Sequence, residues 1–431
     1  MKKHLIVFLT IPLIFGLQLP AWGKEKLKLA VMGSLTGSFA AAGGIAGHRG
    51  ALLAIEMWNA RGGILNKYDI LPVESDDQSS PDVAIREAER LINLEKVPVI
   101  LGFYSSSVAV PLAPIGEKNK TIIWINIATS DKIIEDRHFQ YVFKPQVLGS
   151  QFGERSVDFL KEHYMNLGYS SPSDVKAAVV YEDGPYGMTV KSSNVSQAEK
   201  YKMNIVLTEG YDHTAKDLSS LVLKLKAAKP DVILHTGYYA DVVLFFRQAR
   251  ELGLTVKGIF GHAAAYLNFP GMEKQLGPEI VQYLYCSSTA PMQILDKRKL
   301  TKEMGAIIDE ALKLYEQKYK ETNPAGDFTQ GFGHTWVLMQ TIEHAVRKYG
   351  TPTADNIRKA ALDIDIPEGG TPNGYGVKFA PPNDKYAGKN LRGYPVLTQW
   401  YKGKNWIVSP DSLKAMDAKF PAPAEWPLAA K

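Results

Sequence analysis

The sequence LKLAVMGSLTGSFAAAGGIAGHRGALLAIEMWN, residues 27–59, predicts a strand, a loop and a helix in that order. The apolar run Leu27–Met32 has the length of a buried strand, and a loop rich in Gly, Ser and Thr follows it. From Ile45 to Asn59 apolar residues recur at helical spacing. The side chains that share one helical face are Ala51, Leu52, Ile55 and Trp58. A strand followed by a helix in this way is typical of an α/β protein.

The same alternation recurs in two series of similar length. In the first series we expect strands near 70–73, 97–101 and 121–125, and helices at 81–94 and 107–119. In the second series we expect strands near 177–181, 204–207, 231–234 and 258–260, and a helix at 241–252. Such alternation predicts parallel, doubly wound sheets, and two series predict two lobes.

The pattern changes in the last third of the chain. Helical periodicity returns at 302–319 and at 331–348, and Gly and Pro become frequent at 367–374. The apolar runs at 394–401 and 406–408, separated by a Gly-Lys pair, predict a β-hairpin.

The first residues predict export. Lys2 and Lys3 precede the apolar run Leu5–Leu19, so we expect residues 1–23 to be a cleaved signal peptide. An uncleaved anchor is the alternative, although the run is shorter than the roughly 20 residues of a membrane span. The single cysteine, Cys286, excludes an internal disulfide and a lipobox, and its apolar neighbours predict that it is buried. We therefore expect a protein free in the periplasm of a Gram-negative cell.

Composition and motifs argue against several other functions. The net charge of +5 is spread along the chain, so nucleic acid is not an expected partner. P-loop, Rossmann, nucleophile-elbow and zincin motifs are absent from the sequence, so we expect no enzyme, no cofactor and no metal site. We interpret His235, His262 and His334 as packed or surface residues, and Asp76-Asp77 as a solvated turn. A hydrolase that uses Ser105 with His262, and a purely structural envelope protein, are the alternatives from other classes.

The loops after the strands are the expected binding site, because ligands of open α/β sheets bind beyond the carboxyl ends of the strands. Three loops of the first series, 33–38, 102–107 and 128–130, are rich in small hydroxyls. Hydroxyls and free N–H groups at helix starts bind carboxylates, although each such residue could merely cap its helix. Two loops of the second series, 181–187 and 236–239, carry tyrosines that suit a lid over a small molecule, with surface packing as the alternative.

These segments, in order and over nearly all of the chain after residue 23, resemble the Leu/Ile/Val-binding receptors, the branched-chain amino acid binding proteins of ABC transporters. The matching pieces are LAVMGSLTG (29–37), NARGGI (59–64), DDQS (76–79), GFYSS (102–106), YEDGPYG (181–187), LVLKLKAAKPD (221–231) and RQARELGL (247–254).

The resemblance implies a type I periplasmic binding fold, in which two lobes joined by three crossovers close around a ligand. The expected boundaries are 24–144 and 288–392 for the first lobe, and 145–287 and 393–431 for the second. It also implies a receptor that delivers a small molecule to a membrane permease, and we expect a monomer. A sensor of the same fold that reports the ligand to a signalling receptor is the alternative.

The resemblance further implies the ligand-binding residues. Those expected to hold a carboxylate and an amine from the first lobe are Ser105, Ser106, Ala128 and Thr129, with Tyr104 of the same loop beside them. The tyrosines expected to close from the second lobe are Tyr186 and Tyr238.

Two departures from the family pattern concern the ligand. The family has an acidic residue for the ligand amine after the strand that here ends at Gly261, but this chain continues His262–Ala265. A buried ammonium without a counter-charge costs several kcal/mol. At Gly43 the family commonly has an aromatic residue, and its loss should enlarge the pocket. We therefore hypothesise a bulky or aromatic carboxylate that lacks an α-amine; alternatively Asp183 or Glu182 supplies the counter-charge.

Overall fold

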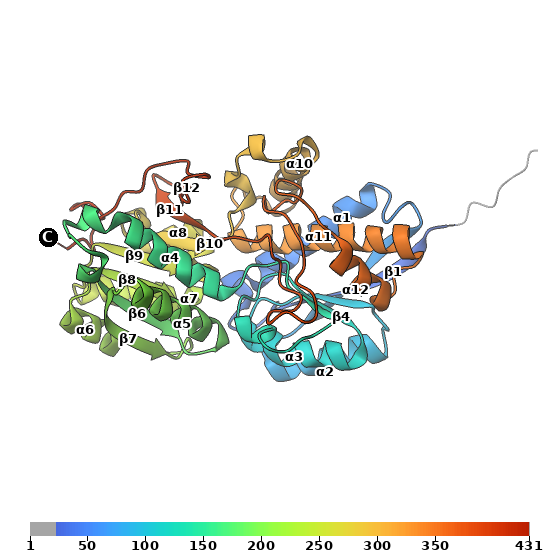
Figure 1. Cartoon of the computed structure of the whole chain (residues 1–431), viewed down its shortest axis with the longest axis horizontal. Helices are drawn as coiled ribbons and strands as arrows, with labels where there is room; N and C mark the ends of the chain where they lie inside the picture. The colour runs from blue at the N-terminus through green and yellow to red at the C-terminus, as the bar shows by residue number, and fades with distance from the viewer. Residues whose placement is uncertain (1–22, 431) are drawn as a thin grey trace, which may run out of the picture.

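The computed structural model describes residues 23–430, so the expected signal peptide lies outside the described residues except for Gly23. Two α/β lobes lie side by side along the long axis of the molecule (Figure 1). The sheet of the first lobe is parallel throughout, in the order β2-β1-β3-β4-β5. Its strands are β1 (Glu25–Gly33), β2 (Tyr68–Asp76), β3 (Val99–Gly102), β4 (Ile122–Ile125) and β5 (Val142–Phe143).

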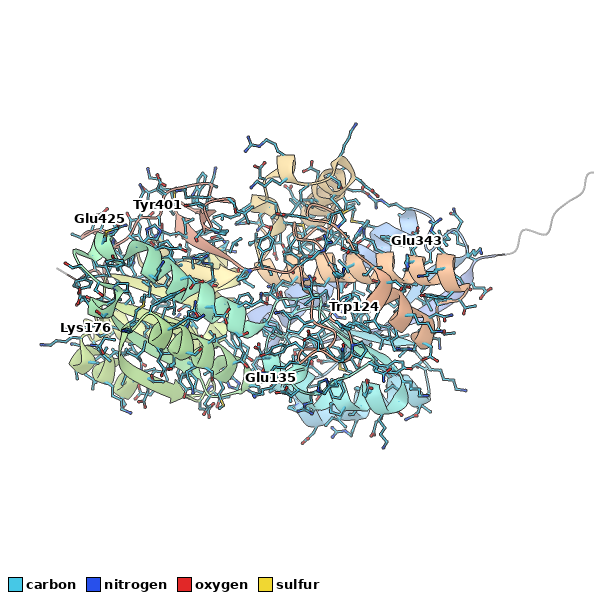
Figure 2. All side chains as sticks on the ribbon, in the orientation of Figure 1. Trp124, Glu135, Lys176, Glu343, Tyr401 and Glu425 are labelled. Carbon is cyan, nitrogen blue, oxygen red and sulfur yellow. The ribbon has the colours of Figure 1, made fainter. Side chains whose placement is uncertain are left out.

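Helices cover both faces of this sheet, as a doubly wound fold requires. They are α1 (Ile45–Ala60), α2 (Pro81–Asn93), α3 (Ser106–Asn119), α10 (Lys302–Tyr319), α11 (Gly326–Tyr349) and α12 (Ala354–Asp363). The side chains of β1 alternate between the faces: Leu29 and Val31 pack with α1, α11 and α12, whereas Ala30 and Met32 pack with α2 and α3. Trp124 of β4, labelled in Figure 2, extends to α11, where its indole N–H donates to the carbonyl of His334 at 2.9 Å.

The second lobe has a seven-stranded sheet in the order β12-β11-β10-β9-β8-β6-β7. Its strands are β6 (Lys176–Glu182), β7 (Asn204–Tyr211), β8 (Val232–Thr236), β9 (Gly258–His262), β10 (Tyr285–Ser288), β11 (Val396–Tyr401) and β12 (Lys404–Ser409). Its helices are α4 (Gly149–His163), α5 (Pro185–Lys200), α6 (Ser219–Ala228), α7 (Tyr239–Glu251), α8 (Phe269–Leu276) and α9 (Pro278–Val281). The two βα lobes expected from the sequence are confirmed.

The predicted C-terminal hairpin is also confirmed, and it makes the second sheet mixed rather than purely parallel. β11 pairs antiparallel with β10 and with β12. Lys402 and Gly403, between the two hairpin strands, both have positive φ angles of 51° and 70°. A two-residue turn of this kind matches the twist of the strands that it joins.

Three chain crossings join the lobes, after β5, after β10 and before β11 (Figure 1). The second crossing leads to α11, which begins at Gly326 rather than at the expected 331. Its glycines are tolerated because α1 packs directly on it: a Cβ on Gly331 would lie 2.0 Å from the carbonyl oxygen of Gly47. This close approach brings the first turn of α11 to the edge of the sheet where the strand-end loops lie.

Candidate ligand-binding site

A small cavity lies between the lobes, beyond the carboxyl ends of the strands. The first lobe lines it with Tyr104, Ser106, Ile127, Thr129, Asp327 and Gln330. The second lobe lines it with Tyr186, Tyr238, Ala263 and Ala264. The cavity has a volume of only about 20 Å³. The lobes are therefore nearly closed on each other, and a ligand needs them to separate before it can enter.

Two of the three hydroxyl loops reach this cavity. Ser106 lies in the first turn of α3, and its hydroxyl accepts a hydrogen bond from the backbone N–H of Ser130 at 3.1 Å. That bond ties the loop after β3 to the loop after β4, which carries Thr129. The N-terminus of α3 adds a partial positive charge at the same edge, which suits a carboxylate.

Ser105 and Ala128, two of the predicted site residues, do not line the cavity. The Ser105 hydroxyl caps α3 by accepting from the N–H of Ser107 at 3.2 Å. The N–H of Ala128 donates to the carbonyl of Phe103 at 2.9 Å, and its own carbonyl accepts from the ammonium of the buried Lys144. Both residues therefore shape the loops that present Ser106 and Thr129.

The first hydroxyl loop, 33–38, does not contribute a hydroxyl to the cavity, contrary to expectation. Its Thr36 hydroxyl donates to the Asp76 carboxylate at 2.7 Å, and the N–H of Leu35 donates to the same carboxylate at 2.9 Å. Asp77 is fully buried, so Asp76-Asp77 is not the solvated turn that we expected. This turn holds the loop that carries Phe39 toward the second lobe.

Aromatic rings close the cavity from both lobes. The ring centroids of Tyr186 and Tyr238 lie 5.6 Å apart, and those of Tyr104 and Tyr238 lie 6.0 Å apart. Phe39, which the sequence analysis missed, stacks on His213 and lies 4.6 Å from the Tyr238 ring centroid. Burial raises the pKa of Tyr104, Tyr186 and Tyr238 well above the usual value, so their hydroxyls are neutral. The lid therefore supplies hydrogen bonds and apolar contact but no charge.

The expectation of a pocket enlarged at Gly43 is wrong. A Cβ on Gly43 would lie 2.4 Å from Cε2 of Tyr104 and 2.6 Å from Oδ2 of Asp327. The space beside Gly43 is thus filled by a ring and a carboxylate that are distant in sequence.

Asp327 is the second site residue that the sequence analysis missed. It lies in the first turn of α11 and is 1% exposed. Burial raises the pKa of its carboxyl to about 8. Its signal in the sequence is weak, because it is a single acid among small residues near a helix start. It also lies outside the strand-end loops, where the site was expected. A carboxylate is therefore present in the cavity, although none follows β9.

The two acids that we considered as counter-charges lie outside the cavity. Glu182 accepts the N–H groups of Gly184 at 2.8 Å and Gly187 at 2.6 Å, so its carboxylate holds the start of α5. Asp183 is exposed. In place of the family's acidic residue, the loop after β9 presents Ala263 and Ala264 to the cavity, with φ angles of 42° and 38°. Non-glycine residues rarely adopt such angles, and they are often found at ligand sites.

The buried histidines form structural networks, as expected. The His262 ring bonds to the Thr236 hydroxyl at 2.9 Å and to the His235 carbonyl at 3.0 Å, and burial lowers its pKa to about 4. Ser105 is bonded to Ser107 instead, so the nucleophile and base of the hydrolase alternative are not paired. Cys286 is buried as predicted, and burial raises the pKa of its thiol to about 12.

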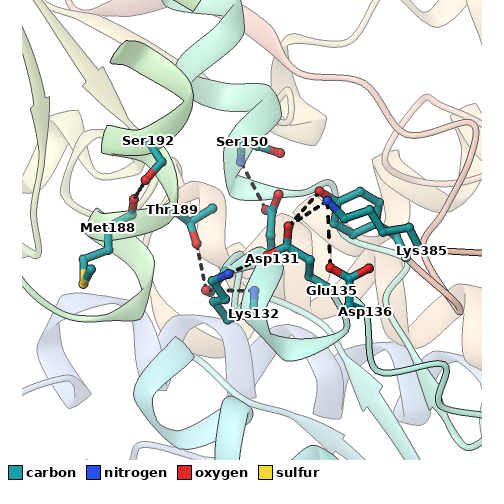
Figure 3. A network of polar contacts seen from close by, with 11 residues as sticks. Asp131, Lys132, Glu135, Asp136, Ser150, Met188, Thr189, Ser192 and Lys385 are labelled. Carbon is teal, nitrogen blue, oxygen red and sulfur yellow. Dashed lines mark hydrogen bonds and ion pairs between the residues drawn. The ribbon is translucent and has the colours of Figure 1, made fainter. Parts of the chain in front are cut away.

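A polar network beside the cavity joins the lobes directly (Figure 3). The hydroxyls of Ser130, after β4, and Thr189, on α5, lie 2.9 Å apart. Asp131 accepts the N–H of Ser150, at the start of α4, at 3.2 Å. The loop that carries Thr129 is therefore bonded to two helices of the opposite lobe.

A larger hollow lies elsewhere, between the β11–β12 hairpin and the segment before α11. It has a volume of about 520 Å³ and is lined by residues such as Pro291, Pro324, Trp400 and Trp406. It shares no lining residue with the cavity between the lobes and has no acidic side chain in its lining, so we do not assign the solute site to it.

Within residues 23–430 no helix combines the length and the apolar character that a membrane span needs. The same residues contain no cluster of three or more His, Cys, Asp or Glu side chains arranged to hold a metal ion.

Comparisons with known proteins agree with this architecture. A family model described as periplasmic binding protein matches residues 26–397. The chain is 29% identical over 422 residues to Leu/Ile/Val-binding protein homolog 7 of Brucella suis biovar 1 (strain 1330), which covers 98% of this chain and 100% of that protein.

Two solved structures share the fold. A leucine-binding protein from Thermotoga maritima MSB8 matches with a TM-score of 0.73 at 21% identity, over 90% of this chain and 100% of that chain. A solute-binding protein of an ABC transporter from R. palustris, in complex with benzoate, matches with a TM-score of 0.71 at 19% identity, over 91% of this chain and 99% of that chain.

Proposed function

The chain belongs to the periplasmic binding protein family, and from that membership we propose that it captures a small carboxylate-bearing solute between its two lobes for an ABC importer. Its relatives and fold neighbours are solute-binding proteins, not enzymes. In this proposal residues 1–23 direct export and are cleaved, the protein acts in the periplasm, and a membrane permease receives the solute.

The observation that carries the proposal is the division of the cavity between the lobes. The first lobe offers the hydroxyls of Ser106 and Thr129 and the N-terminus of α3, which together suit a carboxylate. The second lobe offers the neutral tyrosines Tyr186 and Tyr238. A solute can thus dock on the first lobe while the cleft is open, and closure of the second lobe then removes it from water.

Closure is driven by ligand only if the ligand binds the closed form more tightly than the open form. Tyr186 supports this, because its hydroxyl donates to the carbonyl of His262 and its ring packs on Tyr238. These contacts hold the two lid tyrosines in place within the second lobe. A closed surface that the ligand stabilises is what a permease could recognise.

The matched proteins point to two kinds of solute. One matched relative is named a Leu/Ile/Val-binding protein homolog, and one matched structure contains benzoate. Both kinds of solute carry a carboxylate on an apolar body. The aromatic walls of the cavity suit the apolar body of such a molecule once the lobes have opened to admit it.

Thermal unfolding against a panel of amino acids, aromatic acids, aliphatic acids and small amides tests the proposal. A ligand at 100 times its dissociation constant adds about 2.7 kcal/mol to the free energy of unfolding, which raises the melting temperature by several degrees. A panel in which only compounds without a carboxylate raise the melting temperature would contradict the carboxylate assignment. Loss of solute uptake on deletion of the gene would separate the importer from a sensor of the same fold.

A further inference from the structure

Asp327 carries a buried carboxylate that the fold itself leaves without a partner. The residue is 1% exposed and lines the cavity between the lobes. Neither of its carboxylate oxygens has a hydrogen-bond partner among residues 23–430. Buried polar groups are nearly always hydrogen-bonded, so a buried carboxyl group without a partner is a rare exception. A group of this kind in a ligand cavity points to a partner supplied by the ligand.

The surroundings of Asp327 contain no counter-charge. The titratable groups that face it are the phenol of Tyr104 and the thiol of Cys286. Burial raises the pKa of both, so both are neutral at pH 7. Asp327 forms no ion pair within the described part of the chain. Its own backbone N–H and its position in the first turn of α11 give it partial positive charge but no counter-ion.

We infer that Asp327 binds an ammonium group of the solute, and that the solute is a small zwitterion with its carboxylate at Ser106 and Thr129. This inference rests on the proposed function and specifies its solute class. It replaces the hypothesis of an acid without an α-amine, because that hypothesis assumed a cavity without a carboxylate.

The placement of the two charged subsites supports a zwitterion. Ser106 and Thr129 come from the loops after β3 and β4, whereas Asp327 comes from α11, so different elements of the first lobe supply the two subsites. All three residues line the same cavity. An ammonium group offers three N–H donors, which can satisfy both oxygens of Asp327. The tyrosines of the second lobe then need to cover only uncharged parts of the solute.

The ligand-free state and the bound state differ in one proton under this inference. Burial raises the pKa of Asp327 to about 8, so the empty cavity contains a neutral carboxyl at pH 7. A bound ammonium requires the ionised form, so binding releases about one proton at pH 6.5. Affinity should rise about 50-fold between pH 6 and pH 8, because the ionised fraction of the free protein rises by that factor.

The test compares matched pairs of compounds on three proteins. Each amino acid of the panel is paired with the acid that lacks its amine, for example leucine with 4-methylpentanoate and phenylalanine with 3-phenylpropanoate. Isothermal titration in two buffers of different ionisation enthalpy measures the dissociation constant and the protons released. The proteins are the wild type, Asp327→Asn, and Asp183→Asn, which removes an exposed carboxylate outside the cavity.

We expect an amino acid to bind the wild type at least about 100-fold more tightly than its deaminated partner, with proton release. Asp327→Asn should weaken that binding about 100-fold and abolish the proton release, whereas Asp183→Asn should change neither. Thermal unfolding of each variant confirms that it is folded.

The inference is overturned if a deaminated acid binds the wild type more tightly than its amino acid, or if Asp327→Asn retains both affinity and proton release. The proposed function survives either result, because a carboxylate still binds. If no compound of the panel binds the wild type, the proposed function fails and the inference fails with it.

Discussion

The cost of burying Asp327 should appear in the stability of the ligand-free protein as a dependence on pH. In the folded protein the pKa of this carboxyl is raised by burial from an ordinary 3.8 to about 8. The folded state therefore binds more protons than the unfolded state between these two values. The stability that the folded protein gains by keeping Asp327 protonated is fully present below the pKa of the unfolded state. It is lost as the pH rises through the pKa of the folded state. Asp327→Asn removes this dependence, because an amide does not titrate in that range.

The size of this effect follows from the change in the free energy of unfolding per pH unit. One proton held by the folded state and not by the unfolded state costs about 1.4 kcal/mol per pH unit. Between pH 5 and pH 7.5 the wild type should thus lose about 3 kcal/mol that the Asn variant keeps. Other buried groups that titrate nearby, such as Asp241 and Lys144, are present in both proteins and cancel in the difference.

Urea unfolding of both proteins at pH 5, 6, 7 and 7.5, without ligand, measures the difference in the free energy of unfolding. We expect that difference to grow steadily in favour of Asp327→Asn as the pH rises. Curves that stay parallel across this range would show that Asp327 has an ordinary pKa and has a partner in the folded state. In that case the argument from an unpaired carboxylate would be refuted.

Three further substitutions test the site and its scaffold. Thr129→Val removes one hydroxyl at the carboxylate subsite and should weaken solute binding about tenfold or more in titration calorimetry, with an unchanged melting temperature of the empty protein. Thr189→Val removes the hydroxyl contact between the lobes and should weaken binding by up to about tenfold. The Ser130 hydroxyl still accepts from the N–H of Lys132 in this variant. An unchanged affinity would show that the contact does not favour closure. Gly331→Ala places a Cβ against the Gly47 carbonyl and should destabilise the protein by about 2 kcal/mol in urea unfolding. The control is Gly305→Ala on α10, where the added Cβ would meet no atom within 4 Å, so this variant should be neutral or more stable.

The sequence was sufficient for the fold because local patterns decide it. The alternation of Leu29, Ala30 and Val31 between two helix layers is visible as a short apolar run between loops. The two-residue hairpin turn is visible as Lys402-Gly403 between two apolar runs. The start of α11 was predicted five residues late, at 331 instead of Gly326, because glycines near a helix start lower its helix propensity. Their tolerance depends on contact with α1, which no local pattern shows.

The candidate site was predictable only where it follows the strand-end rule. Ser106, Thr129, Tyr186 and Tyr238, which were expected from the strand-end loops and the family resemblance, line the cavity. Asp327 was missed because its neighbours come from a tertiary contact between α11 and the segment around Gly43. The same contact explains why the pocket is not enlarged at Gly43.

The two lobes line the cavity with different kinds of side chain, so substitutions in each lobe should change solute binding in different ways. The acidic side chain of the cavity, Asp327, and the proposed carboxylate subsite, Ser106 and Thr129, belong to the first lobe, whereas the second lobe lines the cavity with two tyrosines and two alanines. Substitutions in the first lobe should therefore alter which ionic groups are accepted. Substitutions at Tyr186 or Tyr238 should instead alter the balance between open and closed forms, and they should weaken all accepted solutes by a similar factor. A related receptor could thus exchange its solute class through α11 alone while the lid stays the same.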